Sequence, residues 1–494
     1  MAAAEGAAAR REDRRRWLAL IVVCLAMLMN ALDATVVNVA LPRIQQDLHF
    51  TQAGLAWVID AYLVAFAGFL LMAGRLGDMI GRKKVFLIGL AVFTAASLVC
   101  GLAQSQTLLI VARFVQGMFG AFSTSVILAI IATEFPDPRE RARAMSAYIF
   151  VAVGGGAVGL LLGGVLTQAI NWHWIFFINV PVGLLAFVLG VALVEENTGL
   201  GLRGGVDVGG SVLITAGLIL GVYAVVKSST YGWGSARTLG VLGGSIVLIA
   251  AFVALESRLR RPIMPLRIFA VRGLLSSSLV RGFLFMGMYG CFFLGTLYFE
   301  HVRRYSALET GFAFLPLTLV VAFWSTGLSA KLVGRFGARR TLLPSMLCSI
   351  AGLLLLAQAG VRTPYFPDAF FAFVLMGTGM GCGSVPLLTI ALAEVPHADA
   401  GLASGIVNVS MQIAGALGVA VLGTVSSDHT RTLSALGRPL PAALTGGYHL
   451  AFDVAAGCVA AGVLVAIVLL RAPRRPHHAP VGATSRLAAS GEGG

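Results

Sequence analysis

The sequence predicts an all-α membrane protein with fourteen transmembrane helices, arranged as two six-helix repeat bundles and one inserted helix pair. Hydrophobic residues make up 58% of the chain and charged residues only 12%, whereas a soluble domain has about a quarter charged residues. Apolar runs of roughly 20 residues, enough to cross about 30 Å of hydrocarbon, recur along the whole length. Since lipid satisfies no backbone polar group, each run must be a helix.

The expected membrane spans follow one another with short connections. The first run follows a cluster of arginines, as a signal peptide does, but it contains Asp33 and lacks an A-x-A exit, so we expect a retained span. The predicted spans are 17–40, 54–73, 85–104, 108–131, 145–168, 174–194, 208–226, 239–256, 278–299, 311–329, 341–360, 369–393, 404–425 and 450–470.

The basic residues predict the orientation. With an even number of spans, both termini lie on one side, and placing them inside puts about 26 Lys and Arg in inner segments against about eight in outer loops. The positive-inside rule therefore predicts cytoplasmic N- and C-termini in a multi-pass protein of the inner (plasma) membrane. The net charge of +14 has the same origin, so we expect no nucleic-acid partner.

A repeated loop divides the chain into domains. Residues 74–84 (GRLGDMIGRKK) and 330–340 (AKLVGRFGARR) share a Leu, a Gly and a closing basic pair in register. Spans 1–6 and 9–14 then form two bundles, with spans 7 and 8 inserted, a design usual in transporters. The predicted parts are a basic N-terminus 1–16, a first bundle 17–194, an inserted pair 208–256, a second bundle 278–470 and a disordered tail 471–494.

Several chemistries have no support in the sequence. Six scattered cysteines lie in apolar runs without a CxxC pair, so we expect neither disulfides nor a metal site. The Gly-x-Gly-x-x-Gly run at 154–159 lies inside an apolar span without a preceding strand, and no Walker A motif occurs. We therefore expect no cofactor and no enzyme activity.

Five motifs in order resemble the fourteen-span drug:proton antiporter branch of the major facilitator superfamily, over residues 17–470. They are Leu32–Pro42, Gly74–Lys84, Arg113–Gly117, Trp172–Pro181 and Ala403–Gln412. The resemblance implies the superfamily fold and a transporter, expected as a monomer in the bilayer, that exports amphipathic or cationic small molecules, such as drugs or antibiotics, in exchange for protons. Alternatives are a dedicated proton-linked exporter of one endogenous metabolite and a non-transporting sensor, although no loop is long enough for a sensor domain.

The chain departs from the family pattern at three positions. Leu160 follows Gly159 where the antiporter motif usually has Pro, Phe119 stands where Gly is frequent, and His173 stands where Arg is usual. The first departure leaves open whether antiport coupling is altered. The other two leave the fold unaffected.

Three ionisable residues lie at similar depth in the outer half of the membrane: Asp33 in span 1, Asp60 in span 2 and Arg113 in span 4. Such groups are costly in lipid and normally face a cavity or each other. One guanidinium cannot neutralise two acids, so one acid is available to take up a proton. The resemblance favours Asp33 as the coupling acid, tuned by Arg113, with Asp60 second for coupling or for binding a cationic drug. The alternative is a structural Asp33–Arg113 ion pair.

The 74–84 loop resembles a conformational latch of the family. Gly74 and Gly81 permit a tight turn, and Asp78 could begin span 3 or pair with Arg82 and the other bundle, closing the cytoplasmic side. The alternative is that the basic residues only set the topology. The second copy, with Gly334 in place of Asp78, is expected to be a plain turn.

Small and polar residues complete the candidate sites. Helix packing at a bundle interface, or packing alone, is expected from Gly155, Gly159, Gly163 and Gly164. Candidates for a central substrate cavity are Asn30, Tyr298, Trp324, Asn408 and Gln412, although aromatic residues in spans more often pack against lipid or core. Arg281, near the inner end of span 9, could contact a ligand or simply snorkel.

Overall fold

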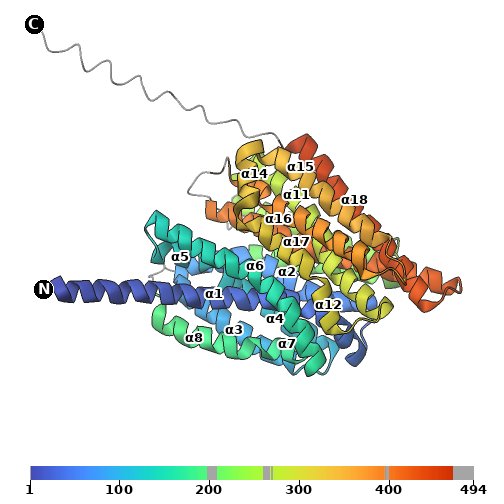
Figure 1. The fold of residues 1–494 in the computed structure, drawn as a ribbon, viewed down its shortest axis with the longest axis horizontal. Helices are drawn as coiled ribbons and strands as arrows, with labels where there is room; N and C mark the ends of the chain where they lie inside the picture. Colours follow the sequence, from blue (N-terminus) through green and yellow to red (C-terminus); the bar gives the residue numbers. More distant parts are fainter. Residues whose placement is uncertain are drawn as a thin grey trace, which may run out of the picture.

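Long helices that cross the molecule make up the fold (Figure 1). The computed structural model describes residues 2–196, 208–259, 267–268, 271–393, 395 and 400–470, and no strand occurs among them. The first half contains α1 (Ala2–Asp47), α2 (Gln52–Ile80), α3 (Arg82–Gly101), α4 (Gln106–Ser125), α5 (Ile127–Glu134), α6 (Pro138–Ala169), α7 (Trp174–Phe177) and α8 (Asn179–Leu193). Then follow α9 (Val208–Tyr231) and α10 (Ala236–Arg258). The second half contains α11 (Arg272–Leu297), η3 (Tyr298–Val302), α12 (Ala307–Ala313), α13 (Leu315–Phe323), η4 (Trp324–Leu328), α14 (Ser329–Phe336), α15 (Ala338–Ala357), η5 (Tyr365–Ala369), α16 (Phe370–Leu392), α17 (Ala400–Ala435) and α18 (Leu440–Leu469), where η marks π-helical turns.

Each predicted span falls on one helix or on consecutive short helices. In the described part of the chain, 11 helices are long and apolar enough to cross a membrane. Three shorter apolar helices, Gly54–Leu70, Val212–Val225 and Ala307–Phe323, occupy predicted spans 2, 7 and 10. The all-α membrane fold is confirmed, while the count of fourteen stays a prediction at these three. The domain limits also stay predictions, and the expected tail 471–494 lies outside the described residues.

The two bundles repeat one packing pattern. In the first bundle, α1 packs on α6 and α8, α2 on α4, and α3 on α4 and α8. In the second, α11 packs on α17 and α18, α13 on α16, and α15 on α16 and α18. When α1 is matched with α11 and the others follow in chain order, each of these five contacts of one bundle has its counterpart in the other.

The repeated loop has the same geometry in both copies. Gly81 (φ 107°) ends α2 and Gly337 (φ 88°) ends α14, and this left-handed region of φ favours glycine. Two residues later, Lys83 Nζ donates to Val191 O at 2.8 Å, and Arg339 Nη2 donates to Ile467 O at 2.8 Å. Each basic side chain thus binds a carbonyl at the end of the last helix of its own bundle, where a positive charge is favoured.

The bundles touch mainly along two seams, and α1 also contacts α11 and α12. One is formed by α2 and α17, and the other by α6 with α12 and α13. A Cβ added to Gly164 would lie 2.8 Å from the Ala307 carbonyl oxygen, and one added to Gly311 would lie 2.8 Å from the Leu160 carbonyl oxygen. The second seam therefore depends on glycine at both helices. The short helices α5 and α14 pack inside their own bundles, and Figure 1 shows them at ends of the two bundles that lie apart.

The inserted pair attaches to one seam. Helix α9 packs on α2, on α17 and on α10. Thr424 of α17 donates its hydroxyl to Val225 O of α9 at 3.4 Å. The α9 helix therefore covers the α2–α17 seam and contacts both bundles.

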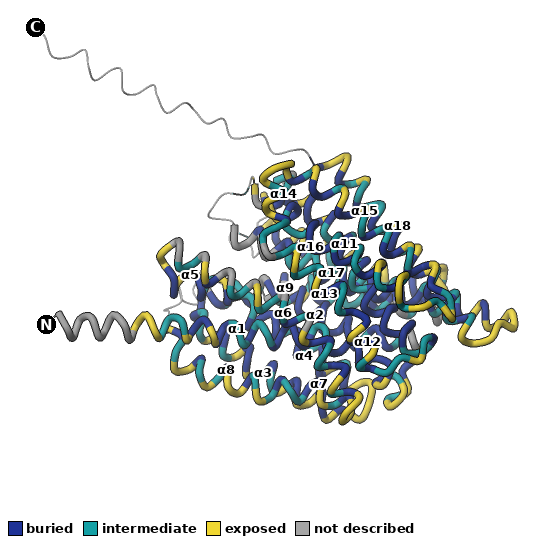
Figure 2. Tube along the Cα trace, in the orientation of Figure 1, coloured by how far each residue is buried: buried dark blue, intermediate teal, exposed yellow. Residues whose placement is uncertain are grey.

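Burial follows from the arrangement of the helices. Figure 2 shows buried residues where the helices cross and exposed residues at loops and helix ends. Large apolar side chains also remain exposed along the outer helices, such as Leu184 (59%) on α8 and Val247 (66%) on α10. An apolar rim of this kind is expected where the solvent is lipid.

Candidate functional site

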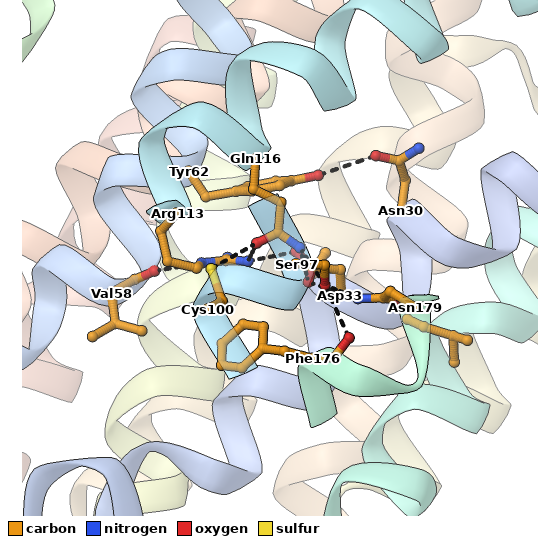
Figure 3. A network of polar contacts seen from close by, with 12 residues as sticks. Asn30, Asp33, Val58, Tyr62, Ser97, Cys100, Arg113, Gln116, Phe176 and Asn179 are labelled. Atoms are coloured by element: carbon orange, nitrogen blue, oxygen red, sulfur yellow. Dashed lines mark hydrogen bonds and ion pairs between the residues drawn. The ribbon is translucent and has the colours of Figure 1, made fainter. Parts of the chain in front are cut away.

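A buried ion pair lies inside the first bundle. Arg113 of α4 donates through Nη1 to Asp33 Oδ2 of α1 at 2.5 Å, and the two side chains are 2% and 0% exposed. Arg113 Nε also donates to Val58 O of α2 at 2.9 Å. The pair therefore ties together three helices (Figure 3).

Neutral polar groups complete this network. The second carboxylate oxygen, Asp33 Oδ1, accepts from Gln116 Nε2 at 2.8 Å and from Asn179 Nδ2 at 3.2 Å. Both amides also donate to Ser97 Oγ, at 3.1 and 3.0 Å, and Ser97 donates to Phe176 O. Both oxygens of Asp33 are thus engaged by donors, which take three of the carboxylate's roughly four acceptor positions.

Sequence reasoning assigned no site role to the residues that complete the network. Gln116 and Asn179 stand inside the motifs 113–117 and 172–181, so the motifs contained a signal for them. Ser97 is an ordinary serine in an apolar run and has no signal in the sequence. Only packing brings α3 and α8 against the pair.

An aromatic ring extends the network toward Asn30. The Arg113 guanidinium lies 4.4 Å from the centroid of the Tyr62 ring, a cation–π geometry. Tyr62 donates its hydroxyl to Asn30 Oδ1 at 3.3 Å, and Asn30 donates to Ala26 O at 2.9 Å. Asn30, a cavity candidate, is 5% exposed and is joined to the ion-pair network rather than to residues of the second bundle.

Asp60 lies apart from this network although it is only two residues from Val58 and from Tyr62. Two residues rotate an α-helix by roughly 200°, so Asp60 lies on the opposite side of α2. Its side chain is 0% exposed, and neither carboxyl oxygen has a hydrogen-bond partner among the described residues. A buried carboxyl without a partner is far more stable neutral than charged.

The side of α2 that carries Asp60 meets the inserted pair and the second bundle. Trp57 lies 6.4 Å, ring to ring, from Tyr223 of α9, and Gly68 faces Thr215 of α9. Trp57 and Gly68 are three and eight residues from Asp60, which places all three on one half of the helix surface. Helix α17 also packs on α2 and α9, so the half of α2 that carries Asp60 faces the helix that covers the seam between the bundles.

The latch residues lie at the end of α2 and the start of α3. Arg82 Nη1 donates to Thr133 Oγ1 at 3.0 Å and to Ala129 O at 3.5 Å, both on α5 of its own bundle. Gly74 lies inside α2, opposite Ser125, and Gly334 of the second copy lies inside α14, so the turns expected at these two glycines are wrong. The turns are at Gly81 and Gly337, where φ is positive. The Asp78 side chain lies outside the described residues.

The glycine candidates divide between two partners. Gly155, Gly159 and Gly163 face α1, where added Cβ atoms would lie close to Ala31, Leu32 and Val36. Gly164 faces α12 of the second bundle. Three of the four glycines therefore pack inside the first bundle, and Gly164 alone reaches the bundle interface.

The remaining cavity candidates do not form one cluster. Gln412 Oε1 accepts from the Tyr289 hydroxyl at 3.1 Å, and Asn408, one turn away, is half-buried. Tyr298 donates to Gly360 O at 2.8 Å and packs against Tyr448 within the second bundle. Trp324 is half-buried and packs against Gly381 of α16.

A family model identifies the architecture. Residues 23–419 match the model described as Major Facilitator Superfamily. The chain belongs to the Major Facilitator Superfamily. The resemblance noted from the motifs is thereby confirmed, and family and fold indicate a multi-pass membrane transporter rather than an enzyme.

Relatives within the superfamily are resistance and export proteins. The chain is 38% identical to "Puromycin resistance protein pur8" of Streptomyces alboniger, over 94% of this chain and 93% of the relative. It is 34% identical to "Tetracenomycin C resistance and export protein" of Streptomyces glaucescens, over 84% and 76%. Among solved structures, a bacterial homologue of the human lysosomal transporter Spinster superposes with a TM-score of 0.66 at 19% identity, covering 93% of this chain and 99% of that one. The latter likeness supports the fold alone.

Proposed function

We propose that this superfamily member exports amphipathic small molecules of the drug or antibiotic class from the bacterial cytoplasm, across the inner membrane, in exchange for protons. Relatives named for resistance to puromycin and for export of tetracenomycin C support the substrate class. The observation that carries proton coupling is Asp60, a buried carboxyl group without a hydrogen-bond partner at the seam between the bundles.

The positions of the seams suggest how protonation and movement are linked. Under the predicted orientation, Gly164 and Ala307 lie near the outer ends of their spans, so their contact would close the outer side. The short helices α5 and α14, at the inner ends, lie apart (Figure 1). Asp60 lies in the outer half of the α2–α17 seam, where it is sealed. Rocking the bundles apart at the outer side would bring Asp60 to external water, where it can exchange its proton.

The Asp33–Arg113 pair is assigned a different role in this proposal. Asp33 has donors on both oxygens, whereas Asp60 has none. We therefore assign proton uptake to Asp60, the second candidate from sequence, and assign Asp33 and Arg113 to holding α1, α2 and α4 together as the bundle rocks. Arg82 and the turn that carries it would hold α5 in place while the cytoplasmic side of the transporter closes.

The proton gradient is large enough for this export. One proton moving through 100 mV releases about 2.3 kcal/mol, and 1.4 kcal/mol corresponds to a factor of ten. One proton per substrate thus supports a gradient of about 50-fold. Exchange also requires that proton and substrate occupancy disfavour each other.

Everted membrane vesicles test the proposal. Wild-type vesicles should accumulate a fluorescent drug when a proton gradient is imposed, and Asp60→Asn should abolish the proton dependence. Asp453→Asn is the matched control, because Asp453 is an exposed acid on α18. Full proton-driven uptake by Asp60→Asn would remove Asp60 from coupling.

A dedicated exporter of one metabolite is the second candidate. It is favoured by relatives whose names specify a single compound, such as tetracenomycin C. Uptake measured across a panel of unrelated compounds separates the two, since a dedicated exporter would accept one chemical scaffold only.

A further inference from the structure

Arg281 of α11 is a half-buried cation inside a predicted membrane span. Its Nη2 lies 3.8 Å from Met411 Sδ of α17, and its guanidinium carbon lies 5.0 Å from the Phe285 ring centroid. Its Nε is buried and has no hydrogen-bond partner among the described residues. The guanidinium therefore has weak neighbours and unused donors.

No acid in the described part of the chain is paired with this charge. The ion pairs found in the described chain do not include Arg281, and the sequences of α11, α16 and α17 before Asp428 contain no Asp or Glu. The other guanidinium within a span, Arg113, is paired with Asp33. A lone charge inside the membrane is costly and normally faces water or a ligand.

Snorkelling does not explain the position of the guanidinium. Met411 is seven residues into predicted span 404–425, which corresponds to roughly 10 Å at 1.5 Å per residue. A side chain extended toward the cytoplasmic surface would place its guanidinium closer to that surface than Met411 lies. Arg281 instead remains beside Met411 and Phe285.

The neighbours of Arg281 form a largely buried cluster suited to an amphipathic molecule. On α11, Phe285 and Tyr289 follow at four and eight residues and share its face. On α17, Met411 lies beside Gln412, which binds the Tyr289 hydroxyl. The cluster thus offers two aromatic rings, a thioether and an amide next to one cation, with Phe285 and Gln412 each 8% exposed.

We infer that Arg281 is the anion-binding point of the substrate site, and that the transporter accepts amphipathic molecules carrying a carboxylate or another single negative group next to an aromatic body. Guanidinium groups bind such anions through paired N–H donors. The inference rests on the proposed export function and defines its substrate class further. It predicts substrates beyond the cationic drugs expected from the family resemblance.

Arg281 would also link substrate occupancy of the site to the movement of the two bundles. With the inner side open, water can reach Arg281. When the inner side closes, that water is removed, and the charge is then stable only if an anion accompanies it. Closure would therefore favour the loaded carrier, and release of the anion outside would favour return to the inward-open form.

Two dyes of one ring system test the inference. Fluorescein is an anion at neutral pH, and a cationic rhodamine has the same fused rings. In everted vesicles, Arg281→Gln should reduce proton-driven fluorescein uptake at least tenfold and leave rhodamine uptake within about twofold, because a charged hydrogen-bonding partner is lost for the anion alone. Arg281→Lys should retain part of the fluorescein uptake.

Arg237→Gln is the matched control, because Arg237 also lies over a ring, that of Tyr231 at 5.5 Å, but is exposed on α10. It should transport both dyes as wild type does. Fluorescence anisotropy of fluorescein with purified, monodisperse protein should show at least tenfold weaker binding to Arg281→Gln, which separates lost binding from misfolding.

The outcomes are distinct. Wild-type vesicles that transport rhodamine but not fluorescein, or an Arg281→Gln variant that changes both dyes equally, overturn the inference and leave the export function standing. Wild-type vesicles that transport neither dye on a proton gradient contradict the export function itself.

Discussion

Replacing Asp33 with Asn removes one charge from the buried ion pair and leaves the shape of the side chain nearly unchanged. Arg113, 2% exposed, then keeps its bonds to Val58 O and Gln116 Oε1 but has no counter-charge. Breaking a buried pair by removing one partner costs about 3–5 kcal/mol. Because two hydrogen bonds of Arg113 survive, we expect a loss of stability near the lower end of this range, about 3 kcal/mol.

This destabilisation is large enough to measure. At roughly 2–4 °C per kcal/mol, Asp33→Asn should lower the melting temperature by about 6–12 °C. A thiol-reactive fluorogenic dye provides the assay, because Cys100 is fully buried and its thiol donates to Gln116 Oε1 at 3.6 Å within the same network. With the other five cysteines replaced by Ala in wild type and variant alike, the reaction of Cys100 on heating reports loss of the packing around the pair.

A double variant separates charge from shape. Asp33→Asn combined with Arg113→Gln removes both charges, so it should recover part of the lost stability, since no unpaired ion remains buried. If Asp33→Asn melts at the wild-type temperature yet loses proton-driven transport, the structural role assigned to this pair is refuted and Asp33 becomes the coupling acid.

Two further predictions concern the seam and the loop. Gly164→Val should slow dye uptake into everted vesicles roughly tenfold, because the valine side chain would collide with Ala307 at an overpacking cost of about 1–3 kcal/mol. Gly154 has open space around it, so Gly154→Val should transport normally. Equal uptake rates for the two variants would contradict a tight outer seam. Arg82→Gln should slow uptake several-fold without lowering the melting temperature, because its bond to Thr133 at 3.0 Å is lost. Lys84→Gln, an exposed neighbour in the same loop, is its control, and similar losses in both variants would favour a role in topology alone.

The sequence by itself determined the architecture. Apolar runs, basic loops and the repeated 74–84 motif were sufficient to predict spans that fall on the described helices, because a chain in lipid must satisfy its backbone within each span. The repeat also predicted an equivalence that the structure displays in detail, with Lys83 and Arg339 binding corresponding helix ends. Depth along the helices correctly suggested that Asp33 and Arg113 could meet.

Only the tertiary structure decided the surroundings of each side chain. Asp33 and Asp60 are alike in residue type and in depth, yet one accepts donors from three side chains and the other from none among the described residues. The reason is rotation about the helix axis: two residues along α2 turn a side chain from Arg113 toward α9 and α17. Which residues surround a side chain depends on how helices that are distant in the sequence pack together. The sequence of a single span does not determine that packing.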